Sequence, residues 1–418
     1  MITNEKILAL TEEAEEKLDK IFRKFDKTSY KNTVKIMEAF ARHRVDESCF
    51  AGTSGYGYGD KGRDTLDEIW AEVFGAERAF VRHNIVSGTH ALAIALFGIL
   101  RPGDIMLSVT GKPYDTLDEV IGINGKNGDG SLADFGVEYM QTDMKNGTID
   151  LEAMKEKLEE NKNRVKMVFI QRSKGYMNRK TLSCDEIGEA VKTVRSICGA
   201  YVVVDNCYGE FVEEKEPTAC GADLVIGSLI KNPGGGMAES GGYIAGTSRA
   251  VELCSYRLTS PGVGLECGAS LNQNKNMYRG LFYAPHTVAS ALKTAALASY
   301  IFEKLGYGVS PSYDEERHDI IQTISFGAKE PLCAFCRGIQ AGSPVEAYVT
   351  PEPWDMPGYS DEVIMAAGTF VSGASVELSA DAPIREPYTA FFQGGLTYES
   401  GKYGIMTAAE YLLKELEK

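Results

Sequence analysis

The segment from residue 201 to residue 246 reads YVVVDNCYGEFVEEKEPTACGADLVIGSLIKNPGGGMAESGGYIAG. It contains three short runs with the composition of β-strands and bounded by turn residues, at positions 201–206, 223–230 and 241–246. The first run is wholly apolar from Val202 to Val204 and ends at Asp205. This is the pattern of a strand that is buried on both faces of a mostly parallel sheet. The segment therefore predicts the centre of an α/β domain.

The regions on either side continue this pattern and divide the chain. Further β-rich runs at 105–110 and 165–171 alternate with helical periodicity at 64–74, 88–100, 149–160 and 184–198, as in βαβ units. Towards the C-terminus a long helical stretch is followed by the β-rich pieces VEAYVT (345–350), EVIMAAGTF (362–370) and ASVELS (374–379) and by a last helix. We therefore predict a helical N-terminal arm with a glycine-rich loop at 1–62, a large α/β domain at 63–290 and a small α+β domain at 291–418.

Composition excludes several classes of function. The chain has 418 residues and a net charge of -15, from 44 Lys+Arg and 59 Asp+Glu, which disfavours binding to nucleic acid or to anionic membranes. Its acidic N-terminus lacks the features of a secretory signal, and its longest apolar run, 91–100, is too short to cross a bilayer. We expect a cytoplasmic protein with no membrane contact.

The nine cysteines are scattered, and we expect them to be reduced thiols. Cys333 and Cys336 form a C-x-x-C pair, but neither a second pair nor a nearby histidine completes a zinc site. We predict no metal, and the role of this pair is left open.

Three features carry the predicted chemistry. Asp205 follows a buried strand, at the sheet edge where open α/β folds bind their ligands, although a plain turn or cap aspartate has the same pattern. Lys231 follows the next apolar run and precedes Asn-Pro-Gly-Gly-Gly, which favours a partly desolvated, nucleophilic amine over a solvated loop lysine. Ser87-Gly88-Thr89 opens an apolar helix whose N-terminus suits a phosphate, or is a simple N-cap.

An anchor for a phosphate, a buried acid and an amine are the contacts that pyridoxal 5'-phosphate (PLP) requires. The acid would keep the pyridine nitrogen protonated, and Lys231 would carry the cofactor as a Schiff base and act as a general base. Together the three features predict a PLP enzyme more specifically than any one of them does.

The sequence also resembles a known family, through the motifs F-A-G-T-S-G-Y-G-Y-G-D-x-G-R-D, V-S-G-T-H-A, G-x-P-Y-D-T-L, V-D-N-C-Y-G-E-F, G-S-L-I-K-N-P-G-G-G and Q-G-G-L. It is similar to the fold-type-I PLP enzymes of the cystathionine and methionine γ-lyase group. It is more closely similar to the methionine γ-lyase-like proteins often labelled aluminium-resistance proteins. The resemblance covers nearly the whole chain and implies a mostly parallel sheet of the seven-stranded type in the large domain.

The resemblance also implies roles for individual residues. Ser87, Gly88 and Thr89 would lie by the phosphate or the ring, Ser228 would add a hydroxyl to the phosphate, and Tyr114 would stack on the ring, or is a core tyrosine. The loop with Tyr56, Tyr58 and Arg63 would reach the phosphate of a neighbouring subunit, although the family spacing is a tighter Tyr-x-Arg and a surface loop is the alternative. This implies a homodimer or homotetramer.

Two more residues are candidates for substrate binding. Ser173 follows the strand 165–171, where relatives place a group near the cofactor, but their usual Asn-Pro is missing here. Arg385 is the best candidate in the C-terminal domain to bind a substrate carboxylate, and a surface ion pair is its alternative role.

The leading hypothesis is an amino-acid lyase that eliminates a sulfur substituent from the β or γ carbon. An aminotransferase or another Cα reaction is the alternative within PLP chemistry, because the cofactor residues do not select the bond that breaks. A non-catalytic PLP-binding protein with a role in metal tolerance is the alternative from another class.

Overall fold

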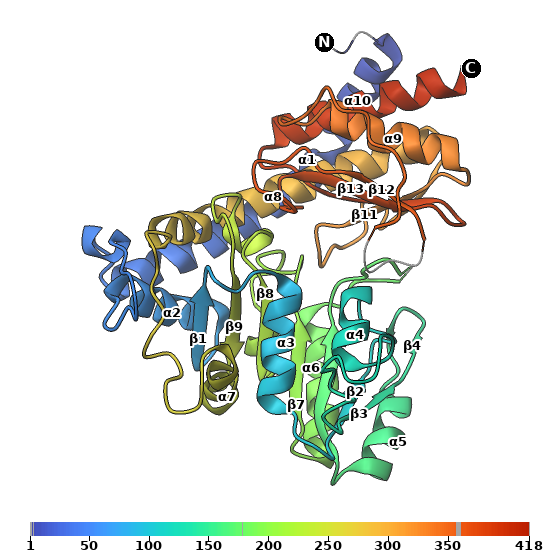
Figure 1. Cartoon of the computed structure of the whole chain (residues 1–418). Coiled ribbons are helices and arrows are strands. Elements are labelled where there is room, and N and C mark those ends of the chain that lie inside the picture. The colour runs from blue at the N-terminus through green and yellow to red at the C-terminus, as the bar shows by residue number, and fades with distance from the viewer. Residues whose placement is uncertain (1, 3, 178, 357–360, 418) are drawn as a thin grey trace. The chain divides into compact units, whose positions relative to one another are not determined.

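A computed structural model describes residues 2, 4–177, 179–356 and 361–417. The chain divides into two compact units (Figure 1). The larger unit contains residues 34–229 and 237–282, and the smaller unit contains residues 1–33, 230–236 and 283–418. These boundaries differ from the predicted cuts at 62 and 290, because each of the long helices α1 (Glu5–Arg42) and α8 (Asn274–Lys304) extends across a boundary.

The larger unit is built on a seven-stranded sheet, which confirms the predicted fold class. The strands lie in the order β1 (Arg78–Arg82), β9 (Gly242–Gly246), β8 (Leu224–Ser228), β7 (Tyr201–Asp205), β6 (Val165–Gln171), β2 (Ile105–Ser108) and β3 (Glu138–Gln141). Only β9 runs against the others among the described strands, since it pairs antiparallel with both β1 and β8. A small antiparallel hairpin joins β4 (Met144–Lys145) to β5 (Thr148–Ile149).

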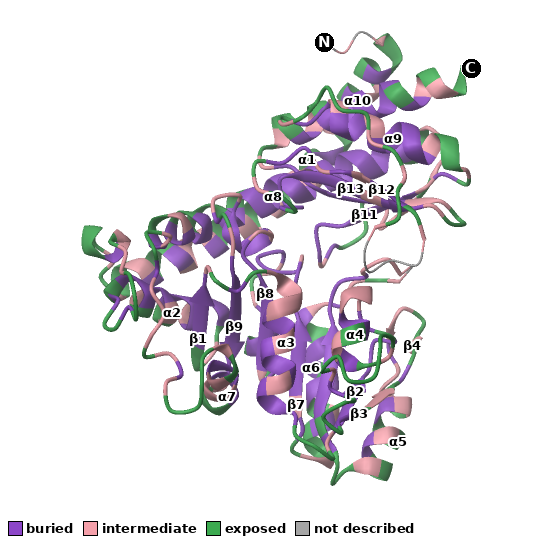
Figure 2. Cartoon of the chain, in the orientation of Figure 1, coloured by how far each residue is buried: buried purple, intermediate pink, exposed green. Residues whose placement is uncertain are grey.

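Helices cover both faces of this sheet. The larger unit contains α2 (Lys61–Phe74), α3 (Gly88–Ile99), α4 (Asp118–Ile121), α5 (Leu151–Asn161), α6 (Cys184–Ile197), α7 (Ser248–Leu258) and the 3-10 turns η1 (Glu47–Phe50), η2 (Asp115–Leu117) and η3 (Pro217–Cys220). Val203 faces a core that α3, α4 and α7 share with the sheet, whereas Trp70 and Phe74 of α2 pack on Tyr243 from the other side. Strands with both faces covered become the buried centre seen in Figure 2.

The smaller unit has a second, wholly antiparallel sheet. Its strands lie in the order β10 (Gly308–Ser310), β11 (Gln322–Ser325), β14 (Thr389–Gly394), β13 (Leu378–Pro383) and β12 (Val363–Ala366). Helices α9 (Lys329–Ala341) and α10 (Tyr398–Leu416) pack so closely that a Cβ atom on Gly338 would lie 2.4 Å from Ala408 Cα. The 3-10 turn η4 (Asn232–Gly234) also belongs to this unit.

Two of the predicted C-terminal strands were wrong in whole or in part. Residues 345–350 form turns and no strand, because Glu346 has a positive φ of 53° and Tyr348 is 87% exposed, which leaves no buried face to pair. In the ASVELS segment the strand begins only at Leu378. Strand β1 and helix α9 lie in regions for which we predicted no element.

None of the described helices is long and apolar enough to cross a membrane.

Candidate active site

Polar side chains gather at the carboxyl ends of the parallel strands in the larger unit. Gln171 ends β6, Asp205 ends β7 and Ser228 ends β8. Gln171 and Asp205 are register partners, so their strands end side by side. This is the edge at which open α/β sheets bind ligands, as the position of Asp205 in the sequence predicted.

The first turn of α3 lies against this edge. Ser87 caps the helix, because its hydroxyl accepts a hydrogen bond of 3.0 Å from the backbone N–H of His90. A Cβ atom built on Gly88 would lie 3.5 Å from Cys207 Sγ and 3.6 Å from Ser228 Cβ. Glycine at this position therefore brings the helix start next to the ends of β7 and β8. The cap takes up the N–H of His90, which leaves those of Gly88 and Thr89 pointing out of the helix.

Two buried side chains at this edge differ in their hydrogen bonding. Ser228 is 1% exposed, and its hydroxyl oxygen has no hydrogen-bond partner among the described residues. A buried hydroxyl without a partner is costly, which indicates that a ligand completes its bonding. Asp205 is also buried, and its Oδ1 accepts a hydrogen bond of 3.1 Å from the N–H of Cys207. Asp205 is thus held at the end of its strand by its own turn.

Tyr114 is positioned next to the same strand ends. Its backbone N–H donates a 2.7 Å hydrogen bond to Gln171 Oε1, and its ring meets that of Tyr176 edge-on with centroids 5.6 Å apart. The hydroxyls of Thr89 and Thr116 are 2.8 Å apart, which ties the start of α3 to the loop that carries Tyr114. The structure therefore brings together Ser87, Gly88, Thr89, Tyr114, Asp205 and Ser228, all of which the sequence singled out.

Lys231 lies three positions after Ser228, immediately before η4. Its backbone is extended, with φ -115° and ψ -151°, and the segment that carries it belongs to the smaller unit. The predicted approach of Lys231 to Asp205 therefore stays a prediction.

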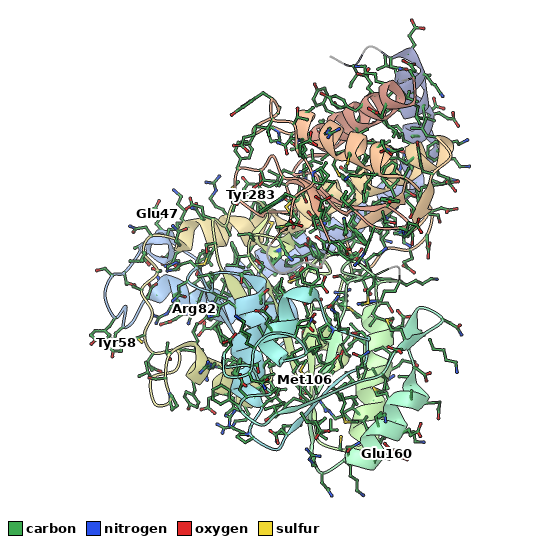
Figure 3. The ribbon with its side chains drawn as sticks, turned by 45° about the vertical axis from the view of Figure 1, so that its right-hand side comes forward. Glu47, Tyr58, Arg82, Met106, Glu160 and Tyr283 are labelled. Carbon is green, nitrogen blue, oxygen red and sulfur yellow. The ribbon has the colours of Figure 1, made fainter. Side chains whose placement is uncertain are left out.

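The loop with Tyr56 and Tyr58 has an exposed tip and a base that is fixed by hydrogen bonds. The two rings stack with centroids 5.5 Å apart and are 74% and 65% exposed, and Figure 3 shows Tyr58 directed away from the protein. Asp60 caps α2 and accepts hydrogen bonds from the side chains of Thr53, Ser270 and Asn274 and from the backbone N–H of Arg63. Asp60 thus fixes the base of this loop.

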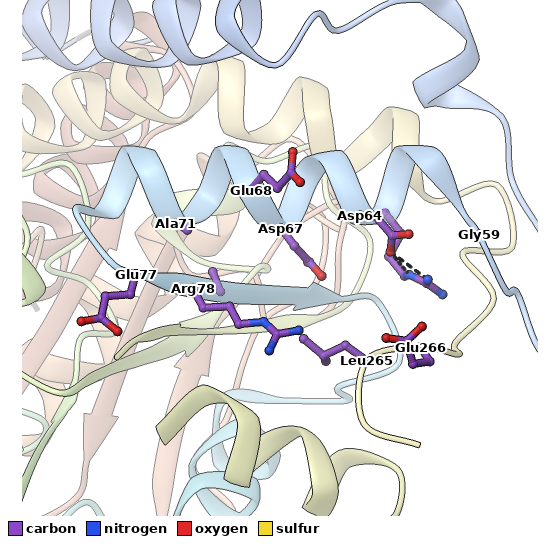
Figure 4. Close-up of a pocket in the computed structure, with 11 residues that line it drawn as sticks. Gly59, Asp64, Asp67, Glu68, Ala71, Glu77, Arg78, Leu265 and Glu266 are labelled. Atoms are coloured by element: carbon purple, nitrogen blue, oxygen red, sulfur yellow. Dashed lines mark hydrogen bonds and ion pairs between the residues drawn. The ribbon is translucent and has the colours of Figure 1, made fainter. Parts of the chain in front are cut away.

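Arg63 is already occupied within its own chain. It is 2% exposed and donates hydrogen bonds of 2.8 Å to the carbonyls of Gly57 and Gly268, and it pairs with Asp64. It borders a cavity of about 320 Å³ (Figure 4). Apart from Arg78, the other charged residues that line this cavity are acidic, namely Asp64, Asp67, Glu68, Glu77 and Glu266. An acidic cavity does not attract a phosphate. The predicted contact of Arg63 with a partner's phosphate stays a prediction, while its place in this chain is structural.

The two candidates for substrate binding have local partners. Ser173 is 6% exposed, and its carbonyl accepts a 3.2 Å hydrogen bond from Gln171 Nε2. Arg385 lies in the smaller unit, about half exposed, and pairs with Asp361 at 3.0 Å. This ion pair is the alternative role that its sequence context left open. Among the described residues, no group of three or more His, Cys, Asp and Glu side chains is arranged to hold a metal ion.

Arg172 is a residue whose importance the sequence did not reveal. Its fully buried guanidinium donates hydrogen bonds to Asn206 Oδ1 at 2.8 Å, to Gly209 O at 3.0 Å and to Glu213 Oε1 at 2.6 Å. Its backbone N–H donates to the carbonyl of Asp205 at 3.0 Å. One side chain therefore fastens the loop that follows Asp205 to the end of β6.

The charges around Arg172 compensate one another. Burial lowers the pKa of Arg172, but the nearby Cys184, Glu213 and Glu216 outweigh this and raise its pKa. Glu216 is 2% exposed and 3.6 Å from Arg172 Nη1, and burial raises the pKa of its carboxyl despite that cation. The acidic residues at 213–216 are the feature of the sequence that could have pointed to Arg172. If their carboxylates are buried, they require a buried cation beside them.

We expect Asp60→Asn to destabilise the protein in a pH-dependent way. Burial raises the pKa of Asp60, but its four hydrogen bonds outweigh burial and lower the pKa from 3.8 to about 2. A lowered pKa stabilises the fold above pH 3.8 and loses this effect as the pH falls towards 2. The variant should lose about 1–2 kcal/mol near pH 7, because an amide keeps the N-cap but accepts the other hydrogen bonds more weakly than a carboxylate, and the difference should shrink below pH 4. Urea unfolding from pH 7 to pH 3 measures this, with the exposed Asp129→Asn as control; a constant difference would contradict the assignment.

Arg172→Met should cost about 3–5 kcal/mol of unfolding free energy, because it leaves buried carboxylates without their cation. The loss should be larger at pH 8 than at pH 6, since a carboxyl whose pKa is raised in the folded state loses stability as the pH rises. Arg164→Met is the control, because Arg164 forms an exposed ion pair with Glu138 and should change stability by about 1 kcal/mol or less. Equal losses in the two variants would show that the Arg172 network is not a structural anchor.

The chain matches known proteins over nearly its full length. A solved structure from Clostridium acetobutylicum, described as a candidate cystathionine beta-lyase involved in aluminum resistance, is 48% identical with a TM-score of 0.95 and covers 98% of this chain and 96% of its own. A carbon-sulfur lyase involved in aluminum resistance from Clostridium novyi NT is 50% identical with a TM-score of 0.94, covering 97% and 96%. These relatives are named as lyases that act on carbon-sulfur bonds.

A more distant structure shares the fold. The pyridoxal-5'-phosphate dependent protein YhfS from Escherichia coli is 16% identical with a TM-score of 0.63, covering 94% of this chain and 97% of its own. Residues 7–413 match the methionine gamma-lyase family. This match, over nearly the whole chain, shows that the protein, with Ser87, Asp205 and Ser228 at its strand ends, belongs to the methionine gamma-lyase family.

Proposed function

We propose that this protein is a PLP-dependent lyase that breaks a carbon-sulfur bond in a sulfur-containing amino acid. The observation that carries the proposal is the buried hydroxyl of Ser228 beside the first turn of α3, which finds no hydrogen-bond partner in the described part of the chain. Membership of the methionine gamma-lyase family and the names of the relatives support the reaction class.

The residues at the strand ends fit the cofactor. The free N–H groups of Gly88 and Thr89 and the hydroxyl of Ser228 provide donors at the positive end of a helix dipole, which suits a phosphate. Asp205 provides a buried carboxylate for the ring nitrogen, and Tyr114, beside the same strand ends, provides an aromatic ring that would stack on the cofactor. When bound, PLP supplies an aldehyde that condenses with amines and a protonated ring that accepts an electron pair from the substrate Cα.

The chain's own residues then perform the remaining tasks. Asp205 holds the proton on the ring nitrogen, because a buried carboxylate strongly favours a cation beside it. Lys231 binds the cofactor and, as a base, takes the proton from the substrate Cα and returns it to the departing group or to the product. Thr89, through its contact with Thr116, keeps the loop of Tyr114 against the start of α3. These roles require the amine of Lys231 to reach the edge that Asp205 occupies.

Lys231→Ala should abolish the visible absorption band of the cofactor-loaded protein and its turnover, because no other amine is proposed to bind the aldehyde. Purified protein is incubated with PLP and then with cystathionine, methionine or cysteine, and ammonia and 2-oxo acid are measured. Elimination releases both without an added oxo acid, whereas transamination requires an oxo-acid acceptor and releases no ammonia. The exposed Lys275→Ala serves as control, and a Lys231→Ala protein with full activity would refute the assignment.

We also propose that the active site is shared between two copies of the chain. The support is the pair of exposed, stacked rings of Tyr56 and Tyr58 on a loop whose base is rigidly held by Asp60. Exposed aromatic side chains on an ordered loop are typical of a contact with another protein surface. The same surface on an identical chain would form a closed two-fold dimer.

A mixing experiment tests the shared site. If Lys231 and the tyrosines of one site come from different subunits, mixing Lys231→Ala with Tyr56→Ala/Tyr58→Ala should restore activity, to about a quarter of the wild-type value for random dimers. Mixing Lys231→Ala with Asp205→Asn is the matched control and should restore none, because both residues are proposed to serve the same site from one chain. Sedimentation as a monomer, or no difference between the two mixtures, would contradict the proposal.

A further inference from the structure

Two cysteines far apart in the sequence meet beside the Arg172 network. Cys184 is the first residue of α6, and Cys220 is the last residue of η3. Gly188 lies one turn after Cys184 on the same helix face, and a Cβ atom built on it would be 3.3 Å from Cys220 Cβ and 4.0 Å from Cys220 Sγ. Both cysteines are free thiols, and Cys220 packs against the face of α6 that carries Cys184.

The two thiols differ in exposure and in acidity. Cys184 is fully buried, and its Sγ is 3.1 Å from the carbonyl of Lys215, whereas Cys220 is partly exposed. The neighbouring Cys184 side chain lowers the pKa of Cys220 to about 7, against burial and with help from the charge of Lys215. The Cys220 side chain and burial raise the pKa of Cys184. Near neutral pH, Cys220 is therefore the thiol that loses its proton first.

The charges around the pair act in both directions, since Lys215 lowers the pKa of Cys220 whereas Asp185 and Glu213 raise it. Lys215 lies near Cys220 and forms an ion pair with Asp185, which weakens but does not remove its positive charge. Arg172 faces Cys184 and favours its ionised form, whereas Glu213 and Glu216 oppose it. A thiolate that is open to solvent and in contact with a second thiol is the arrangement of a redox-sensitive cysteine pair.

We propose that Cys184 and Cys220 form a reversible disulfide when the protein meets a hydroperoxide, with Cys220 as the attacking thiolate and Cys184 as the resolving thiol. This site is separate from the strand-end residues proposed to bind the cofactor, and it does not depend on their function.

The reaction balances in two steps. Cys220 thiolate attacks the outer oxygen of the hydroperoxide, the O–O bond breaks, and an alcohol (water, for hydrogen peroxide) leaves with one proton while Cys220 becomes a sulfenic acid. Cys184 sulfur then attacks the Cys220 sulfur, and hydroxide leaves with the Cys184 proton as water. The two thiols lose two electrons in total, which the peroxide gains. An external dithiol reverses the change by thiol-disulfide exchange.

The first step prepares the second. While Cys220 is a thiolate, it raises the pKa of Cys184 and so keeps the Cys184 proton in place. Oxidation removes that negative charge, and Arg172 then remains as the neighbouring cation that favours the Cys184 thiolate. The buried thiol becomes a nucleophile only after its partner has been oxidised.

The C-x-x-C pair in α9 does not compete for this role. Cys333 and Cys336 are 5% and 0% exposed, and burial is the largest cause that raises the pKa of each thiol. Thiols that are buried and protonated react slowly with peroxides. The motif that is conspicuous in the sequence is thus the less reactive pair in the structure.

Alkylation and peptide mapping test the proposal on the full-length protein. At pH 7, Cys220 should react with iodoacetamide about five- to tenfold faster than the partly exposed Cys198, because about half of Cys220 is thiolate. After brief treatment with hydrogen peroxide, non-reducing tryptic digestion should yield a disulfide between the peptides 181–192 and 216–231, and dithiothreitol should remove it. A Cys220 that reacts no faster than Cys198, or a digest without the linked peptides, would overturn the proposal.

Two serine variants separate the steps. Cys184→Ser should retain a reactive Cys220 and stop at the sulfenic acid, which dimedone labels, whereas Cys220→Ser should give neither the label nor the disulfide. Cys198→Ser is the matched control and should behave as wild type. Peroxide labelling of Cys184 in the Cys220→Ser protein at the wild-type rate would show that Cys220 is not the attacking thiol. Circular dichroism of each variant confirms that the fold is kept.

Discussion

The arrangement of the candidate site depends on one buried cation. Arg172 has no exposed surface, and it is surrounded by carboxylates and carbonyl oxygens from the loop that follows Asp205. A guanidinium in this position is stable only if its donors are satisfied, and the carboxylates are stable only if the guanidinium stays. The mutual requirement holds the chain after β7 in one conformation. The backbone bond from Arg172 to Asp205 extends this constraint to the acid proposed to face the cofactor.

The same constraint links two regions with different chemistry. Glu213 accepts hydrogen bonds both from Arg172, at 2.6 Å, and from the backbone N–H of Cys184, at 3.1 Å. The thiol pair and the strand end that carries Asp205 are therefore separated by a short path of charge-assisted contacts. A change of charge at Cys184 alters the surroundings of the guanidinium directly. Cys184 and Cys220 thus lie next to Arg172 and outside the proposed cofactor site.

The sequence predicted the centre of the fold better than its periphery. Strands β7 and β8 follow from continuous apolar runs, which leave few alternatives. The position of Asp205 follows from the direction of a parallel strand, whereas the role of Ser228 is implied by the family resemblance. The predicted strand at 345–350 was wrong because alternating apolar residues form a strand only when a partner strand exists. Arg63 has a structural role that no local pattern reveals, since its acceptors, such as Gly268, are distant in the sequence.

The N-cap at Ser87 limits what this helix can bind. Its hydroxyl accepts from His90 with one lone pair and keeps its hydrogen and a second lone pair for a neighbour. The backbone N–H groups of the first turn can only donate, and the positive end of the helix dipole favours negative charge beside them. A phosphate ester at this turn would therefore be held more strongly as a dianion than as a monoanion, and that preference follows its second ionisation, near pH 6.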